Sequence, residues 1–252
     1  MTASSLLRLS LVAAVATMML PAASAQDKEI PDFIKICKRN DPELNACITE
    51  SVIQLKPALK SGVEGFLPSL EPLFMKEVLI TENGGFKIVG NDVKTYGCSN
   101  FRIFNMKANM DTLLIEFDLE LPHLYSVGTY DVNGRILLIP IKGNGPFTGN
   151  WTECTAHVAL QGKLEDKNGY KFITFETLKI DVTVGDGSID LQNLFGGEKV
   201  IGDAINSAVN SNFKHILREL RHPIEKALEE ALIEISNDCV RDYTFDQLLP
   251  VS

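Results

Sequence analysis

The chain has no sequence pattern typical of a reaction centre. It contains no Gly-x-Ser-x-Gly turn that would expose a nucleophilic serine, and no pair of histidines at the spacing of a zinc site. The segment Asp186-Gly-Ser-Ile-Asp190 lacks the alternating acidic ligands of a calcium loop. The four histidines are dispersed along the chain. We therefore predict a protein that is not an enzyme, with no catalytic residues, no metal and no cofactor.

Basic residues are also scarce. Lysine and arginine number 24 against 33 aspartates and glutamates, which gives a formal net charge of -9. Nucleic acids and anionic membranes attract proteins through basic patches. The charge balance therefore argues against both as partners.

Long apolar runs are missing except at the N-terminus. There Arg8 precedes the apolar run Leu9–Leu20, and Ala23-Ser-Ala25 follows. This is the layout of a secretory signal peptide, and the run is shorter than the ~20 residues of a spanning helix. A membrane anchor is the alternative. No linker rich in Pro, Ser or Gly divides the remainder. We expect a signal peptide at 1–25, one secreted, extracellular domain at 26–252, and no stable membrane insertion.

Cysteines are few and odd in number. Cys37 and Cys47 flank a short polar segment, which in a secreted protein predicts a local disulfide. Cys98, Cys154 and Cys239 leave open whether they are free thiols or include a second bond. The alternation of residues 152–164 places Cys154 on one strand face, where it would be a buried small hydrophobe.

One glycosylation sequon is present, Asn150-Trp-Thr152, directly after a turn that contains Gly and Pro. It predicts a glycan on Asn150.

The periodicity of apolar residues changes twice along the chain. A helical pattern begins at Asp41-Pro42 and ends by Gly62. From about residue 77 to 184 the period is two, which predicts antiparallel strands with turns at Asn133-Gly134 and Asn168-Gly169. From residue 201 to 235 helical spacing returns, and Pro223 predicts a bend in one long helix.

The architecture can be predicted by matching the apolar face of the sheet with that of the long helix. In the segment Thr112–Leu121 one strand face is apolar and the other charged, as in a sheet covered on one side. The long C-terminal helix is the only predicted element of matching length. We therefore predict an α+β domain in which a strongly curved antiparallel sheet wraps lengthwise around this helix.

The chain also resembles the takeout / juvenile hormone binding protein family of insects over essentially the whole mature sequence. The residues that carry the resemblance, in order, are IPDFIKICKRNDPELNAC, GFLPSLEPLF, YGCSNF, GTYDVNGRILLIPIKGNGPF, IDLQNLFGGEKVIGDAINSAVNSNF and FDQLLP. In having a single N-terminal cysteine pair, the chain resembles the takeout branch of this family. The resemblance implies a tubular lipid-binding (TULIP-like) fold. It also implies a carrier, secreted into haemolymph or another extracellular fluid, that holds a terpenoid, fatty acid or similar lipid in an internal apolar tunnel.

Candidate tunnel-lining residues are the inward apolar positions of the central strands and the helix. They are Phe117, Leu119, Tyr130, Val132, Leu137, Val158, Leu160, Phe175, Phe213 and Leu217. Ordinary core packing is the alternative for each of them. The Tyr130 hydroxyl is a candidate polar anchor for a ligand, with a satisfied hydroxyl near the core as the alternative.

A different class of function fits the same sequence. An extracellular interaction protein would have a filled core and would act through a receptor or another carrier protein. The sequence alone leaves both hypotheses open.

Overall fold

The computed structural model describes residues 29–83, 86–136 and 139–251, and the expected signal peptide lies outside them. The helices and strands follow in this order: α1 (Leu44–Gln54), α2 (Lys56–Ser61), β1 (Leu73–Asn83), β2 (Phe86–Tyr96), the 3-10 turn η2 (Cys98–Asn100), β3 (Arg102–Asn109), β4 (Leu114–Ile136), β5 (Ile139–Lys167), β6 (Tyr170–Leu191), α3 (Lys199–Ser211), α4 (Phe213–Val240) and α5 (Phe245–Leu248). None of the described helices is both long and apolar enough to cross a membrane.

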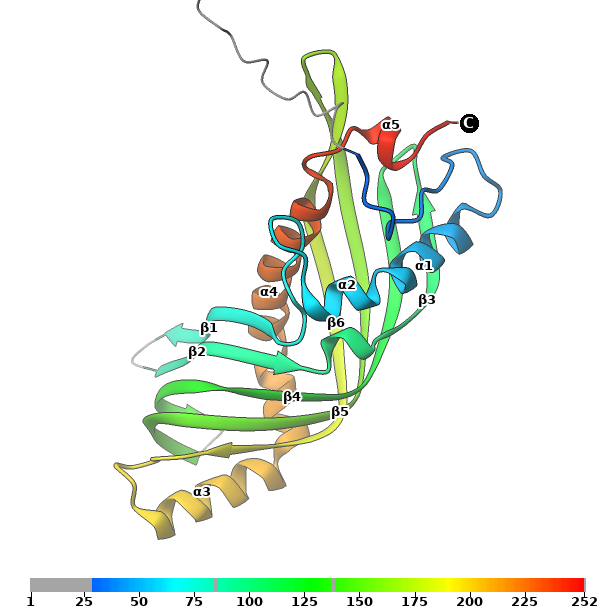
Figure 1. Cartoon of the computed structure of the whole chain (residues 1–252). Coiled ribbons are helices and arrows are strands. Elements are labelled where there is room, and N and C mark those ends of the chain that lie inside the picture. The colour runs from blue at the N-terminus through cyan, green and yellow to red at the C-terminus, as the bar shows by residue number, and fades with distance from the viewer. Residues whose placement is uncertain (1–28, 84–85, 137–138, 252) are drawn as a thin grey trace, which may run out of the picture.

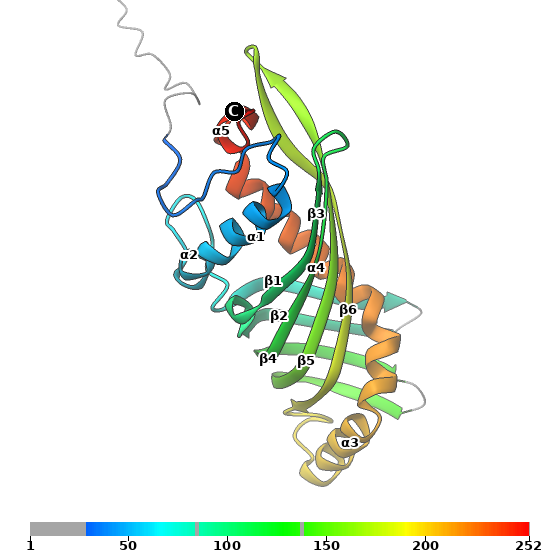
Figure 2. The same ribbon diagram turned by 90° about the vertical axis from the view of Figure 1, so that its right-hand side faces the viewer.

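The strands form one antiparallel sheet in the order β1-β2-β4-β5-β6. β3 pairs with the first part of β4, and β2 pairs with its second part. The region expected to form antiparallel strands thus contains three strands of more than twenty residues each, β4, β5 and β6. Figures 1 and 2 show the sheet curling around α4, which runs beside β6.

The sheet bends where the alternation of its residues between the two faces shifts by one position. The inner face is the one toward α3 and α4. In β5 the inner positions are Cys154 and every second residue after it, all buried as far as Leu160. Before Glu153, which has a left-handed φ of 53°, the inner residue is Trp151. A left-handed residue turns the backbone, so the face switches there. Thr152, expected on the face of Cys154, therefore lies on the opposite face.

The C-terminal helix breaks at the same corner. The single helix expected from the sequence is wrong, because Asn212 leaves the helical region with a φ of -110° and separates α3 from α4. Pro223 lies inside α4. The rings of Trp151 and Phe213 stack at 5.9 Å between centroids, which joins the corner of the sheet to the corner of the helices. A Cβ on Gly187 would come within 2.7 Å of Phe213 Cζ, so this contact requires glycine.

The turn expected at Asn133-Gly134 is also wrong. Both residues belong to β4 and pair with Lys142 and Ile141, and the ladder continues to the pair Ile136 and Ile139. The additional ladder pairs extend the sheet beyond the position that turn propensity alone would choose. The turn at Asn168-Gly169 is confirmed, with φ values of 58° and 84° between the paired Lys167 and Tyr170.

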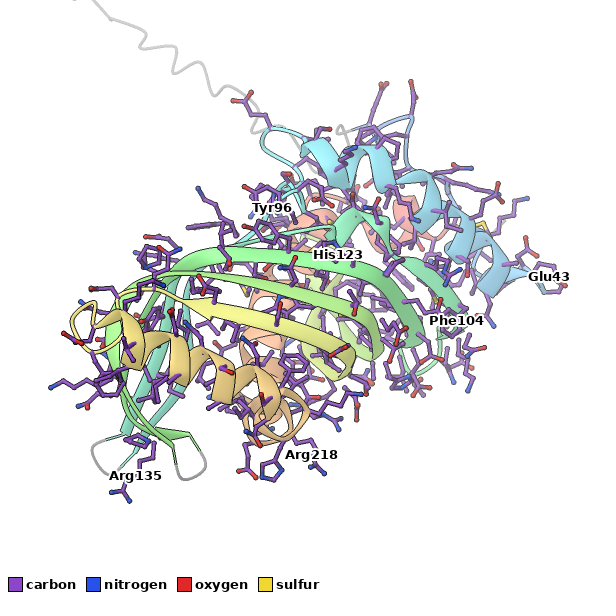
Figure 3. All side chains as sticks on the ribbon, turned by 90° about the horizontal axis from the view of Figure 1, so that it is seen from below. Glu43, Tyr96, Phe104, His123, Arg135 and Arg218 are labelled. Atoms are coloured by element: carbon purple, nitrogen blue, oxygen red, sulfur yellow. A yellow bond between two sulfur atoms is a disulfide. The ribbon has the colours of Figure 1, made fainter. Side chains whose placement is uncertain are left out.

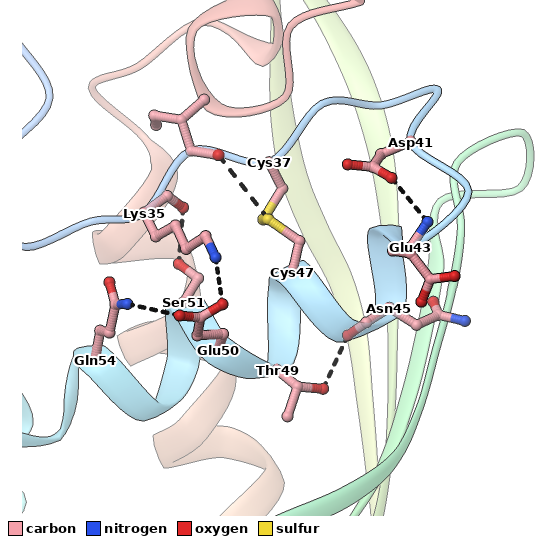
Figure 4. The surroundings of a disulfide bond; sticks show 11 residues. Lys35, Cys37, Asp41, Glu43, Asn45, Cys47, Thr49, Glu50, Ser51 and Gln54 are labelled. Atoms are coloured by element: carbon pink, nitrogen blue, oxygen red, sulfur yellow. Dashed lines mark hydrogen bonds and ion pairs between the residues drawn. A yellow bond between two sulfur atoms is a disulfide. The ribbon is translucent and has the colours of Figure 1, made fainter.

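The N-terminal segment is fastened to α1 by a disulfide between Cys37 and Cys47, with an S–S distance of 2.07 Å (Figure 4). One helical turn further on, Ser51 Oγ donates a hydrogen bond to the Lys35 carbonyl at 2.9 Å. Asp41 accepts a hydrogen bond from the Glu43 amide at 2.8 Å, just before the helix begins. The expected helix is split at Leu55, and Pro57 lies in the first turn of α2.

Helix side chains seal the free edge of β6. Three asparagines of α3 and α4 each accept a hydrogen bond from one β6 amide and donate one to the carbonyl of the same residue, at 2.8 to 3.0 Å. These pairs are Asn206 with Leu191, Asn210 with Ile189, and Asn237 with Phe175. Between them Glu225 and Glu229 accept from the amides of Val182 and Ile180. We call these five side chains the edge latch.

We predict that Asn210→Ala lowers the free energy of unfolding by about 1–3 kcal/mol, because the Ile189 amide and carbonyl lose their partner in a half-buried position. Urea unfolding measures the loss. Ser207→Ala, at an exposed position of the same helix, is the matched control. Equal stability of the two variants would show that the Asn210 pair of the latch contributes nothing to stability.

Candidate functional site: the apolar interior between the sheet and α4

Two apolar clusters fill the interior on either side of the corner. The terminal cluster joins the first part of β4 with β5, β6 and α5. Its buried members are Leu113, Ala156, Val158, Leu160, Ile173, Phe175, Leu178, Ile180 and Phe245. The α3 cluster joins the other half of the sheet with α3 and the start of α4. Its buried members are Tyr130, Val132, Ile141, Leu191, Leu194, Val209 and Ile216.

Part of the terminal cluster is not fully covered. Most inner residues of β5 and β6 are buried, with Leu164 and Val182 as half-buried exceptions, whereas Ile115, Phe117, Leu119 and Leu121 on the inner face of β4 all keep accessible surface. β4 is paired on both edges here, by β3 and β5, so strand pairing does not account for the exposure. These residues stay accessible because α4 packs mainly on β6 and leaves this part of β4 uncovered. We call these four residues the open strip.

α4 shows the same incomplete burial. Only Phe213 and Ile216 of its 28 residues are buried, both in its first turn. The apolar side chains further along are half-buried, and Leu228, Leu232 and Ile233 pack against the terminal cluster as Phe117 and Leu119 do. The open strip and the facing side of α4 therefore both remain accessible. They border the buried residues of β5 and β6 in the terminal cluster, which we call the buried floor.

The structure divides the candidate lining residues between these surroundings. Phe117 and Leu119 belong to the open strip, and Val158, Leu160 and Phe175 belong to the buried floor. Tyr130 and Val132 lie in the α3 cluster, where Val132 is only 3% exposed. Phe213 is at the corner and Leu217 is half-buried outside both clusters. Leu137 lies outside the described residues. Their role toward a ligand stays a prediction.

Tyr130 is held by the protein itself. Its hydroxyl donates a hydrogen bond to the Gln192 carbonyl at 2.6 Å. Burial, with the charge of Asp190 as the smaller cause, raises the pKa of Tyr130 to about 12. The phenol therefore stays protonated and fixes the segment between β6 and α3, so its proton is not free for a ligand.

Ile115 and the α4 residues Leu228 and Leu232 are absent from the sequence-based candidate set. Helical spacing and strand alternation identify Ile115, Leu228 and Leu232 as inward-facing. What they cannot give is the degree of coverage, which depends on where α4 lies across the sheet.

The titratable groups near the interior include three cysteine thiols with raised pKa values. Burial is the main cause that raises the pKa of the Cys98 thiol to about 12 and those of Cys154 and Cys239 to about 11. His157 lies on the outer face, where Nδ1 is 2.7 Å from Asp118 Oδ1. Within the described residues no group of three or more His, Cys, Asp or Glu side chains is placed to hold a metal.

Comparison with known proteins gives consistent matches. The model of the haemolymph juvenile hormone binding protein (JHBP) family matches residues 10–250. The circadian clock-controlled protein daywake of Drosophila melanogaster is 24% identical over 230 residues, covering 86% of this chain and 87% of that protein. A putative beta-carotene-binding protein of Schistocerca gregaria is 21% identical over 220 residues, covering 86% and 88%. The crystal structure of Epiphyas postvittana Takeout 1 has a TM-score of 0.75 at 22% identity, covering 86% of this chain and 99% of that one. This likeness confirms the predicted fold.

We predict that iodoacetamide alkylates Cys98, Cys154 and Cys239 far more slowly in the folded protein at pH 8 than in urea. Only the thiolate reacts. At that pH a pKa of about 11 leaves about one thiol in a thousand ionised at Cys154 and Cys239, and a pKa of about 12 leaves about one in ten thousand at Cys98, against roughly a quarter at the ordinary pKa. Mass spectrometry of timed samples checks this. Rapid labelling of the folded protein at any of the three would show that its thiol is exposed and reactive.

Proposed function

We propose, because the chain belongs to the haemolymph juvenile hormone binding protein family, that it is a secreted carrier of a small hydrophobic ligand. The binding site is the apolar interior along the open strip and the facing side of α4, the place expected for an internal tunnel. The observation that supports this site most directly is that both surfaces keep apolar area accessible around a buried floor.

The driving force is burial of apolar surface. A ligand that removes about 300 Å² of apolar surface from water gains about 7.5 kcal/mol at 25 cal/mol per Å², before the loss of its translational freedom. A fully packed core would leave no such area to cover. The half-buried state of Phe117 and Leu119 therefore supports a ligand-binding interior over a fully packed core.

The lining also sets the class of ligand. The open strip is aliphatic and aromatic, with no charged side chain among its four members, so it suits a terpenoid, a fatty acyl chain or a similar lipid. A relative that is named as a putative beta-carotene-binding protein supports the same class.

The first test is the content of the purified secreted protein. Organic extraction followed by mass spectrometry is expected to recover an apolar molecule in a stoichiometric amount. An empty extract together with no binding of fluorescent fatty-acid and terpenoid probes would instead favour an interaction protein with a filled core.

The second test locates the site. We predict that Leu119→Trp weakens probe binding by about tenfold, which corresponds to 1.4 kcal/mol, because the indole occupies part of the space above the small neighbour Ala156. Leu79→Trp, at a position of β1 that is 47% exposed, is the matched control. Unchanged binding in a folded Leu119→Trp protein would place the ligand elsewhere. Val132 is unsuitable for this test, since it is too deeply buried to accept a larger side chain.

A further inference from the structure

The outer face of the sheet has an aromatic shelf beside the sequon. Tyr96 of β2 lies opposite Tyr125 of β4, and Tyr125 lies opposite Asn150 of β5. Residues opposite each other on neighbouring strands point to the same face, with Cβ atoms about 5 Å apart. The three side chains therefore form one row across the sheet.

Both rings are left exposed. Tyr96 is 39% and Tyr125 36% exposed, and their ring centroids are 6.4 Å apart with a tilt of 31°. With Pro122 and His123 they line a largely apolar hollow of about 320 Å³. Figure 3 shows Tyr96 and His123 close together, with the strands between them and α3. A hollow of this size is at the small end of ligand sites and fits a single sugar ring.

Asn150 is positioned at the edge of this hollow. Its side chain is exposed, and Oδ1 lies 3.3 Å from Nε2 of His123, which lines the hollow. No described residue makes a hydrogen bond to Asn150 Nδ2. The nitrogen that a glycan would occupy is therefore free, and the amide is held by its oxygen alone.

We propose that Asn150 carries an N-linked glycan whose first N-acetylglucosamine lies on the shelf formed by Tyr125 and Tyr96. In the linking step Nδ2 forms a bond to the anomeric carbon of an oligosaccharide attached to a polyprenyl diphosphate. The bond from that carbon to the diphosphate oxygen breaks, the diphosphate leaves, and Nδ2 loses one proton. The proposal requires passage through the secretory pathway and is independent of what the interior binds.

The shelf gives the glycan a structural role. The apolar face of a sugar ring covers the exposed aromatic surface that would otherwise be hydrated. The attached sugar is held close to the shelf by its covalent bond, so little further freedom is lost when it settles there. The glycan is therefore expected to stabilise the fold through Tyr125.

The experiment uses the full chain secreted from insect cells. Enzymatic removal of N-glycans is expected to raise the mobility of the native chain, and Asn150→Gln and Thr152→Ala are expected to abolish that shift. Thr152→Ser keeps the sequon and is expected to preserve it. A native chain whose mobility does not change on glycan removal would overturn the proposal.

The shelf is tested by a double-mutant cycle on stability. Removing the glycan is expected to raise the unfolding equilibrium constant about two- to tenfold, the range of aromatic ring contacts. In Tyr125→Ala the same removal is expected to have no effect, while in Tyr170→Ala, at a similarly exposed tyrosine on the β5–β6 hairpin, the full effect is expected. An equal effect in Tyr125→Ala and in the native chain would overturn the assignment of the shelf.

Discussion

The bidentate hydrogen bonds between asparagine side chains and the edge of β6 determine where α3 and α4 lie against the sheet. An edge strand presents unpaired amides and carbonyls, and here Asn206, Asn210 and Asn237 supply both partners that a further strand would supply. A carboxylate at Glu225 accepts from one more amide. Because each of these bonds fixes one residue of a helix against one residue of the strand, the helices are held in register along β6. That position leaves the inner face of β4 partly uncovered.

The bend of the sheet adds the second constraint. A sheet that switches faces at Glu153 cannot be followed by a straight helix, and the helix breaks at Asn212 beside the same corner. The stacked rings of Trp151 and Phe213 hold the two bends together. Trp151 also donates a hydrogen bond to Ser126 at 2.9 Å, so its indole nitrogen is satisfied inside the fold. The interior is thereby divided into two apolar clusters with different degrees of coverage.

The sequence predicts the fold well because its main signal is the pairing of a period-two face with a helical stripe. The open strip residues Phe117 and Leu119 come from that alternation. Three features follow from tertiary contacts that periodicity does not encode. A glutamate in the left-handed region bends β5, the ladder passes through Asn133-Gly134, and coverage by α4 separates accessible residues from buried ones such as Val132. The tyrosine hydroxyl proposed as an anchor is likewise occupied by a backbone carbonyl that lies 62 residues away in sequence.

The edge latch also affects how copies of this protein behave toward one another. Strands of different molecules associate when each offers a flat edge with free backbone groups. On β6 those groups are already bonded to the helices of the same molecule. On the opposite side, β1 has an irregular pairing between Leu79 and Thr81 and carries the exposed charges of Lys76 and Glu77. Neither edge strand, β1 or β6, therefore offers a flat row of free backbone groups to a second molecule. This arrangement disfavours edge-to-edge association of the sheets, although three of the strands are longer than twenty residues.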